Sequence, residues 1–294
     1  MNFTKVKKGL LLTISCCILS ISSLVAQDWQ TTNTKVLKAI NDGEYQLALQ
    51  DALVARDLAK KEFDSKDPNY LCSLHNLASV YHKLGQFDAS RSAYLQSIKI
   101  AVAYLGKDHP VYAIGLYRLA DLYQFNGNKE KALTLYQEAL PVLNKVYGEN
   151  HPHSMACINN LGRLYYDLGQ ALEAEEYLVK ALRLRENNKE IASEDYATSL
   201  NDLANLYKNT WRYEEAEVLY KKALKCREEN TNESHPAYAQ NLHDLGNLYE
   251  LRKQYKEAED LYLEAIKIKE LKLGRSHPSY LKSIDDLVQL VKMK

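Results

Sequence analysis

The fold is decided by the stretch HPAYAQNLHDLGNLYE at residues 235–250, which the chain repeats with variations. Its leading pair, His235-Pro236, has counterparts at intervals of 42 residues along the chain. The other members of this series are Asp67-Pro68, His109-Pro110, His151-Pro152, Ser193-Glu194 and His277-Pro278. A fixed period of this length indicates an array of repeated structural units.

Each copy contains two amphipathic segments. In the first segment, Leu242, Leu245 and Tyr249 are spaced by 3 and 4 residues, which places them on one face of a helix. In the second segment, Ala258 and Tyr262 follow the same spacing. Neither helix can bury its apolar stripe alone, so neighbouring copies must stack. The sequence therefore predicts an all-α fold.

The period divides the chain into predicted domains and repeats. Five full repeats are expected at residues 68–108, 110–150, 152–192, 194–234 and 236–276. A diverged unit is expected at 28–66, because Gly43 and Tyr45 fall in register with Gly85 and Phe87. Residues 278–293 are predicted to form a single C-terminal capping helix, so that the whole array covers 27–294.

The second helix of each later repeat ends in basic residues, among them Arg185, Arg227 and Lys269. Cations at a helix C-terminus interact favourably with the helix dipole. We interpret these three side chains as serving that purpose.

The first 26 residues differ in kind from the repeats. Lys5, Lys7 and Lys8 form a cationic segment, an apolar stretch follows from Gly9, and Ala26 precedes polar residues. This order is typical of a secretory signal peptide, so we expect residues 1–26 to be removed and the protein to be exported to the periplasm or the extracellular space. After cleavage no stable membrane insertion is expected. The alternative is an uncleaved segment that anchors the protein in a membrane.

Composition excludes some functions. Lysine plus arginine equals aspartate plus glutamate, at 38 each, so no basic excess favours nucleic acid as a partner. Outside the signal the cysteines are Cys72, Cys157 and Cys226, which are widely spaced and predict helix packing without a disulfide framework.

The histidines do not predict a metal site. His109, His151, His235 and His277 occur once per repeat, so they cannot converge on one ion, and we interpret them as turn or capping residues. The sequence lacks the common nucleophile, phosphate-binding and zinc motifs. We expect no catalytic residues, no metal and no cofactor, and we predict that the protein is not an enzyme.

The repeat also resembles a known family, the tetratricopeptide repeat. The resemblance runs from Leu161-Gly162-x-x-Tyr165 through Gly169, Ala174, Leu178 and Ala181. The 42-residue length and the Gly-x-x-His-Pro connector are similar to the kinesin light chain type of this repeat. The resemblance implies a right-handed α-solenoid, which is a superhelix of stacked antiparallel helix pairs. It covers nearly all of residues 28–294.

In this family the first helices line a concave groove that contacts a peptide or a partner domain. The resemblance therefore implies that polar, non-core positions of the first helices form the binding site. The candidate groove residues are Asn76, Arg118, Asn159, Asn160, Arg163, Asn201, Asp202, Asn205, Lys208, His243, Asp244 and Asn247. The simpler interpretation of each residue taken alone is a solvated helix face.

Three functions follow from this sequence. The leading one is an exported, non-catalytic scaffold that binds a protein or peptide in the groove, with a monomer favoured. The second is a structural protein that assembles with itself through its terminal units. The third is a sensing or regulatory arm for a separately encoded enzyme.

Overall fold

The computed structural model describes residues 28–187, 193–230 and 235–293, and the signal predicted at 1–26 lies outside them. The described residues form helices joined by short turns and contain no strand. The all-α prediction is confirmed, with consecutive helices packed as pairs. The chain divides into two compact units, Met1–Val146 and Tyr147–Lys294, called unit 1 and unit 2 below.

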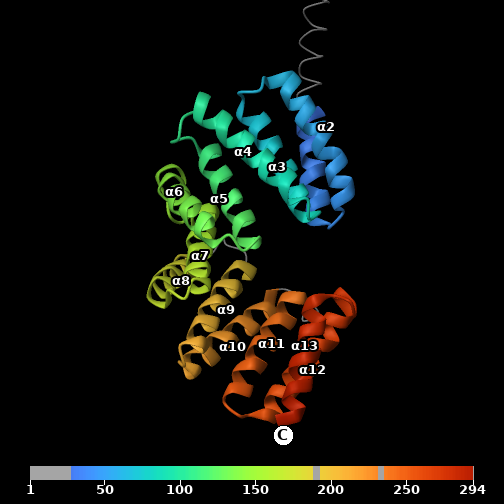
Figure 1. Cartoon of the computed structure of the whole chain (residues 1–294), viewed down its shortest axis with the longest axis vertical. Coiled ribbons are helices and arrows are strands. Elements are labelled where there is room, and N and C mark those ends of the chain that lie inside the picture. The colour runs from blue at the N-terminus through green and yellow to red at the C-terminus, as the bar shows by residue number, and fades with distance from the viewer. Residues whose placement is uncertain (1–27, 188–192, 231–234, 294) are drawn as a thin grey trace, which may run out of the picture. The chain divides into compact units, whose positions relative to one another are not determined.

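Unit 1 begins, among the described residues, with a helix at 28–41. It continues with α2 (Tyr45–Phe63), α3 (Pro68–Lys83), α4 (Phe87–Tyr104), α5 (Pro110–Phe125) and α6 (Lys129–Tyr147) (Figure 1). Consecutive helices from α2 to α5 pack on one another, and α3 also contacts α5. First helices of neighbouring pairs therefore touch directly.

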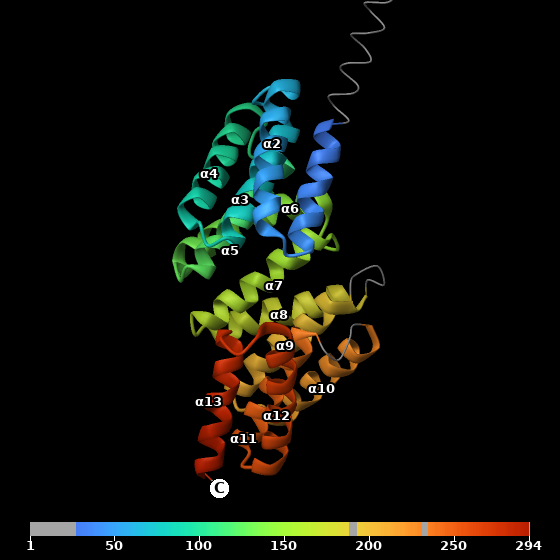
Figure 2. The same ribbon diagram turned by 90° about the vertical axis from the view of Figure 1, so that its right-hand side faces the viewer.

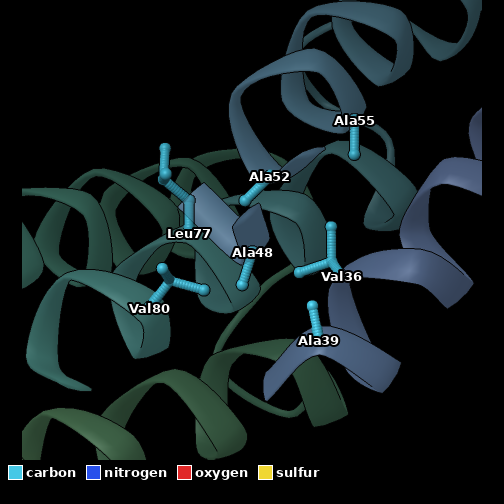
Figure 3. Packing of buried hydrophobic residues seen from close by; sticks show 7 residues of the cluster. All are labelled: Val36, Ala39, Ala48, Ala52, Ala55, Leu77 and Val80. Carbon is cyan, nitrogen blue, oxygen red and sulfur yellow. The ribbon is translucent and has the colours of Figure 1, made fainter. Parts of the chain in front are cut away.

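The core of unit 1 at its N-terminal side is built from small side chains. Figure 3 shows Val36 and Ala39 of the helix at 28–41 facing alanines of α2 and two larger residues of α3. These partners are Ala48, Ala52, Ala55, Leu77 and Val80, and all are buried. Alanine has no side chain beyond Cβ, so it lets the helix backbones approach closely while Leu77 and Val80 fill the remaining space.

Unit 2 contains α7 (Pro152–Asp167), α8 (Ala171–Glu186), α9 (Ser193–Asn209), α10 (Tyr213–Asn230), α11 (Pro236–Leu251), α12 (Tyr255–Leu273) and α13 (Pro278–Met293). Each helix packs on the next, as Figure 2 shows for α11 and α12. The first helix α9 also contacts the first helices α7 and α11. This direct contact allows side chains one repeat apart to meet.

The recurrent histidines cap the first helices, as predicted. In each case Nδ1 accepts a hydrogen bond from the backbone N–H two residues later, at 3.3 Å for His109, 3.2 Å for His151 and His235, and 3.1 Å for His277. Asp67 makes the same bond at 2.8 Å. A proline follows each cap in the first helical turn, where its missing N–H costs nothing.

The turn inside each helix pair needs a residue with positive φ. Gly43, Gly85, Gly127 and Gly169 occupy this position in the first four pairs, with φ between 72° and 79°. In the next two pairs the position is held by Trp211 (φ 64°) and Lys253 (φ 60°). These two residues adopt the left-handed conformation at a steric cost that glycine avoids.

No helix among the residues that the structure describes has the length and apolar character needed to cross a membrane.

Candidate partner-binding site

The twelve predicted groove residues fall into two groups. Asn76 and Arg118 lie in unit 1, and the other ten lie on α7, α9 and α11 of unit 2. In unit 1, Asn76 donates a hydrogen bond to Asn33 Oδ1 (2.8 Å). Arg118 is exposed and lies 3.9 Å from the Asp121 carboxylate. The site is therefore best described in unit 2, where most of its members lie.

Five of the predicted residues in unit 2 connect neighbouring first helices. Asn159 Nδ2 on α7 donates to Asp202 Oδ2 on α9 (2.7 Å), and the Asn201 amide donates to Asp244 Oδ2 on α11 (3.1 Å). His243 on α11 is the residue equivalent to Asn159 and Asn201 in the following repeat. Its Nδ1 atom lies 3.0 Å from Ser283 Oγ of α13, and its Nε2 atom lies 3.1 Å from Asp286 Oδ2. The Nε2 contact is not aligned for a hydrogen bond. We call this series the interhelix ladder.

Burial corrects the predicted position of three ladder residues. Asn159 is 3% exposed, His243 is 1% exposed and Asp244 is also buried. The assumption that they are open positions of a groove is wrong, because side chains 43 residues apart point at one another across the helix contact. Burial also raises the pKa of Asp202, and the nearby Arg163 and Asn159 act in the opposite direction.

A column of buried cations lies behind the ladder. Arg185 Nη1 donates to Asn159 Oδ1 (3.1 Å), to the Asp195 carbonyl (2.9 Å) and to Ser199 Oγ. Arg227, one repeat later, pairs with Glu194 (2.9 Å) and Asn241. The equivalent positions in unit 1 are apolar and buried: Ala59, Ala101 and Leu143.

Lys269 is the third member of this column and is 1% exposed. Its ammonium group donates to Gln240 Oε1 and Ser283 Oγ, both at 2.9 Å. Burial lowers its pKa to about 8, although Asp244 and Asp286 oppose the shift. The interpretation of Arg185, Arg227 and Lys269 as dipole partners missed their main role, which is to satisfy buried polar groups of the next first helix.

The remaining predicted residues present hydrogen-bond donors. Asn205 Oδ1 on α9 accepts from the buried Tyr220 hydroxyl (2.7 Å), so its Nδ2 group is directed away from that tyrosine. Tyr262 meets both Asn247 Oδ1 and Glu250 Oε2, the latter at 2.7 Å. The Tyr262 hydroxyl has a single proton for these two acceptors, and the Glu250 carboxylate is a stronger acceptor than the Asn247 amide.

Two cations lie beside these amides. Lys208 is half-buried, its ammonium group lies 6.0 Å from the centre of the Tyr220 ring, and it interacts electrostatically with Asp244 and Asp286. Burial lowers its pKa. The Arg163 side chain is 51% exposed and lies 3.8 Å from Asp202. Asn160 is half-buried and is held by neighbours within the protein. We call Arg163, Asn205, Lys208 and Asn247 the donor face of unit 2.

The structure also contains a feature that the sequence interpretation did not identify. A cleft of about 520 Å³ lies between α8, α9 and α10. Its apolar lining includes Val179 and Leu182 of α8, Leu203 of α9, and Val218 of α10. The available signal was a break in the repeat, because valine at position 218 replaces residues that are polar in the other copies: Ser92, Thr134, Glu176 and Asp260.

Among the described residues, no three His, Cys, Asp or Glu side chains are grouped so that they could hold a metal ion. Among the described residues, Cys72, Cys157 and Cys226 are not joined in disulfides.

Comparison with known proteins agrees with the architecture. The family model described as "Tetratricopeptide repeat" matches residues 39–101, 70–145, 112–187 and 192–270. No curated protein matches the sequence. The matches to the family model span most of the chain.

Several solved structures are similar in fold. A Podosopora anserina protein, described as a kinesin light chain with nearly identical TPR-like repeats, is 27% identical, with a TM-score of 0.58 over 71% of this chain and 99% of that one. BtubC (BKLC) from P. vanneervenii is 24% identical, with a TM-score of 0.62 over 83% and 94%. A Rap protein complexed with Competence and Sporulation Factor is 19% identical, with a TM-score of 0.63 over 90% and 75%.

The helix pairs, their capped starts and the family match lead to one assignment. The protein is a helical repeat scaffold, and its chain belongs to the tetratricopeptide repeat family.

Proposed function

We propose that this protein is an exported, non-catalytic scaffold that binds a peptide or a partner domain on the donor face of unit 2. The observation that carries the proposal is on α9. There the Asn205 amide and the Lys208 ammonium group lie one helical turn apart with donors that no described residue accepts from.

The surrounding acceptors are already used within the protein. Asp202 accepts from Asn159, Asp244 accepts from Asn201 and Gln240, and the Glu250 carboxylate accepts from Tyr262. The donor face therefore offers more free donors than free acceptors, despite its many acidic residues. An extended peptide presents a carbonyl oxygen at every residue, so it supplies the acceptors that these groups need.

The likeness to the Rap protein concerns the fold. That protein was solved in complex with Competence and Sporulation Factor, which is compatible with a repeat array of this kind binding a partner.

The test replaces the hydrogen-bond donors of Asn205 and Lys208 and keeps an acceptor for the Tyr220 hydroxyl. A random peptide library is selected against the full chain, and the affinity of the best peptide is measured by calorimetry for the wild type and for Asn205→Asp with Lys208→Met. The introduced carboxylate would still accept from Tyr220, as Asp121 accepts from Tyr136 in unit 1. We expect binding to weaken about tenfold or more, because two hydrogen bonds to the peptide are lost.

The control is Val218→Asp, which lies in the cleft between α8 and α10 and should leave peptide affinity unchanged. Equal affinity of the wild type and the Asn205→Asp, Lys208→Met variant would place the binding site elsewhere.

Export is the second part of the proposal and rests on the sequence of residues 1–26. If the signal is cleaved after Ala26, the mature protein begins at Gln27, and intact-mass measurement of the protein from the extracytoplasmic fraction should give that N-terminus. An intact N-terminus on protein from the membrane fraction would favour the anchored alternative.

A further inference from the structure

We propose that the cleft between α8 and α10 is a second interaction surface, and that it receives an amphipathic helix of a partner protein with an acidic residue beside its apolar stripe. The surface is separate from the donor face in its residues and in its chemistry. Val179, Leu182, Leu203, Val218 and Leu219 supply apolar lining, and the charged rim includes Arg183, Glu186, Glu214 and Glu215.

The apolar character of this cleft departs from the repeat. Val218 is 65% exposed, whereas its equivalent one repeat later is Asp260. Val179, on the facing helix, is replaced one repeat later by Lys221, which pairs with Glu217 at 2.6 Å. The column of Val179 is apolar in most other copies, at Leu53, Leu95 and Leu263, so the departure lies at Val218. A repeat array needs only its stacking residues to be apolar, so an exposed valine at position 218 serves another purpose.

The charged residues on the rim of the cleft indicate which charge a partner side chain should carry. Glu186 accepts from Lys222 (2.9 Å) and from the Tyr196 hydroxyl (3.1 Å), and Glu215 pairs with Arg212. The third rim glutamate, Glu214, lies 3.8 Å from Arg252. Arg183 is exposed, and among the described residues it has no ion-pair partner. The open charge on this rim is therefore positive, which favours a carboxylate on the partner.

The shape of the lining favours a helix as the occupant. The lining comes from two second helices of adjacent pairs, α8 and α10, together with the first helix α9. A groove between helices accepts the side-chain ridge of a further helix. Backbone groups in α8 and α10 are used within those helices, so an extended strand has no sheet edge with which to pair. An amphipathic helix meets the apolar lining with side chains alone.

The test uses two synthetic peptides of about 18 residues, a length at which an amphipathic helix becomes populated. Both carry leucines on one face, and they differ only in the residues that flank this face, which are glutamates in one peptide and lysines in the other. We expect the glutamate peptide to bind the full chain at least threefold more tightly than the lysine peptide, as about 0.7 kcal/mol from one rim ion pair implies.

The matched variant restores the pattern that the chain uses one repeat later. Val179→Lys with Val218→Asp copies Lys221 and Asp260, so it should fold, and we expect it to weaken the glutamate peptide about tenfold or more. Arg183→Gln should remove the preference between the two peptides. Asn205→Asp on the donor face should change neither result, which separates this proposal from the proposed function.

Three outcomes would overturn the proposal. They are no binding of either peptide, equal binding of both peptides to the wild type, and unchanged binding to the Val179→Lys, Val218→Asp variant. If light scattering shows the wild type to self-associate through this cleft, with association lost in that variant, the occupant is a second copy and the partner helix is ruled out.

Discussion

At the scale of single residues, the turn inside each helix pair shows how the repeat tolerates a costly substitution. Four pairs place glycine at the position of positive φ, and the next two place Trp211 and Lys253 there. A side chain at this φ clashes with the backbone, at a cost of roughly 1–2 kcal/mol. Both side chains are exposed, so burial does not offset the cost.

We predict that Lys253→Gly stabilises the protein. Relief of backbone strain favours the folded state, while the greater flexibility of glycine in the unfolded chain offsets part of the gain. The net increase in the free energy of unfolding should be about 0.5–1 kcal/mol, measured by urea denaturation.

The reciprocal change provides the control. Gly85→Ala introduces a Cβ that meets no atom within 4 Å, so only the φ of 72° opposes it, and this variant should be less stable by about 1 kcal/mol. If Lys253→Gly destabilised the protein, the turn would be held by contacts of the lysine side chain.

At the scale of helices, buried cations join the second helix of one pair to the first helix of the next. Lys269 on α12 reaches Ser283 on α13, and Arg185 on α8 reaches Ser199 on α9. Burying a charge costs free energy unless it is hydrogen-bonded, and these groups are bonded on several sides. The arrangement predicts a specific dependence of stability on pH.

The pKa of Lys269 is about 8 in the folded protein and is near 10.4 when the chain is unfolded. Between these values the unfolded chain binds more protons, so the free energy of unfolding rises with pH. We predict that the wild type gains stability relative to Lys269→Met between about pH 8 and pH 10.4. Below about pH 8 the difference between the two proteins should be constant.

Urea denaturation of both proteins at a series of pH values gives this difference, in which other titrating groups largely cancel. Lys267→Met, which removes an exposed lysine from the same helix, is measured alongside as the matched control. A constant difference for Lys269→Met across the whole range would mean that the lysine titrates normally in the folded state.

Features that depend on adjacent residues can be predicted from this sequence, whereas contacts between distant residues cannot. Helix starts were predictable because the cap and the proline act on adjacent backbone groups, as at His109 and Pro110. The interhelix ladder was not predictable, because Asn159 bonds to Asp202, 43 residues away. In a sequence, a polar helix residue that faces water cannot be told from one that faces a neighbouring helix. The role of Arg185 was misinterpreted because a cation near a helix C-terminus fits two roles. It can interact with the helix dipole, as predicted, or it can bond buried polar groups of the next first helix, as the structure shows.

The candidate binding site stays a prediction, and its residues differ in how the structure places them. Asn205 and Lys208 were identified from their column in the repeat, and the structure leaves both with free donors. Asn159 and His243 were placed in the groove by the same rule, although they are buried. The cleft between α8 and α10 escaped notice because its two valines, Val179 and Val218, belong to different repeats and become a surface only after stacking.

At the scale of the whole molecule, stability should be distributed locally. The described helices contact the next helix along the chain or the next first helix, so a local defect weakens nearby pairs before distant ones. The two units also differ at the repeat position of Arg185, Arg227 and Lys269. Its residues are buried cations in unit 2 and buried apolar side chains in unit 1.

We predict that Ala52→Leu loosens only part of the chain. Ala52 of α2 is buried in a cluster with residues of the helix at 28–41 and of α3 (Figure 3). The larger leucine side chain should lower the free energy of unfolding by about 1–3 kcal/mol. Hydrogen exchange followed by mass spectrometry should show faster exchange in these helices and unchanged exchange from α9 to α12. Faster exchange throughout the chain would mean that the protein opens as one cooperative unit.

The interhelix ladder makes residues 194–235 a self-complementary module. This segment carries Asp202, the acceptor for the preceding first helix, and Asn201, the donor to the following one. A duplicated segment would therefore meet a correct partner at both of its junctions. The array can grow by duplication of whole repeats without any new residue at the joints, and the same property makes its length adjustable by design.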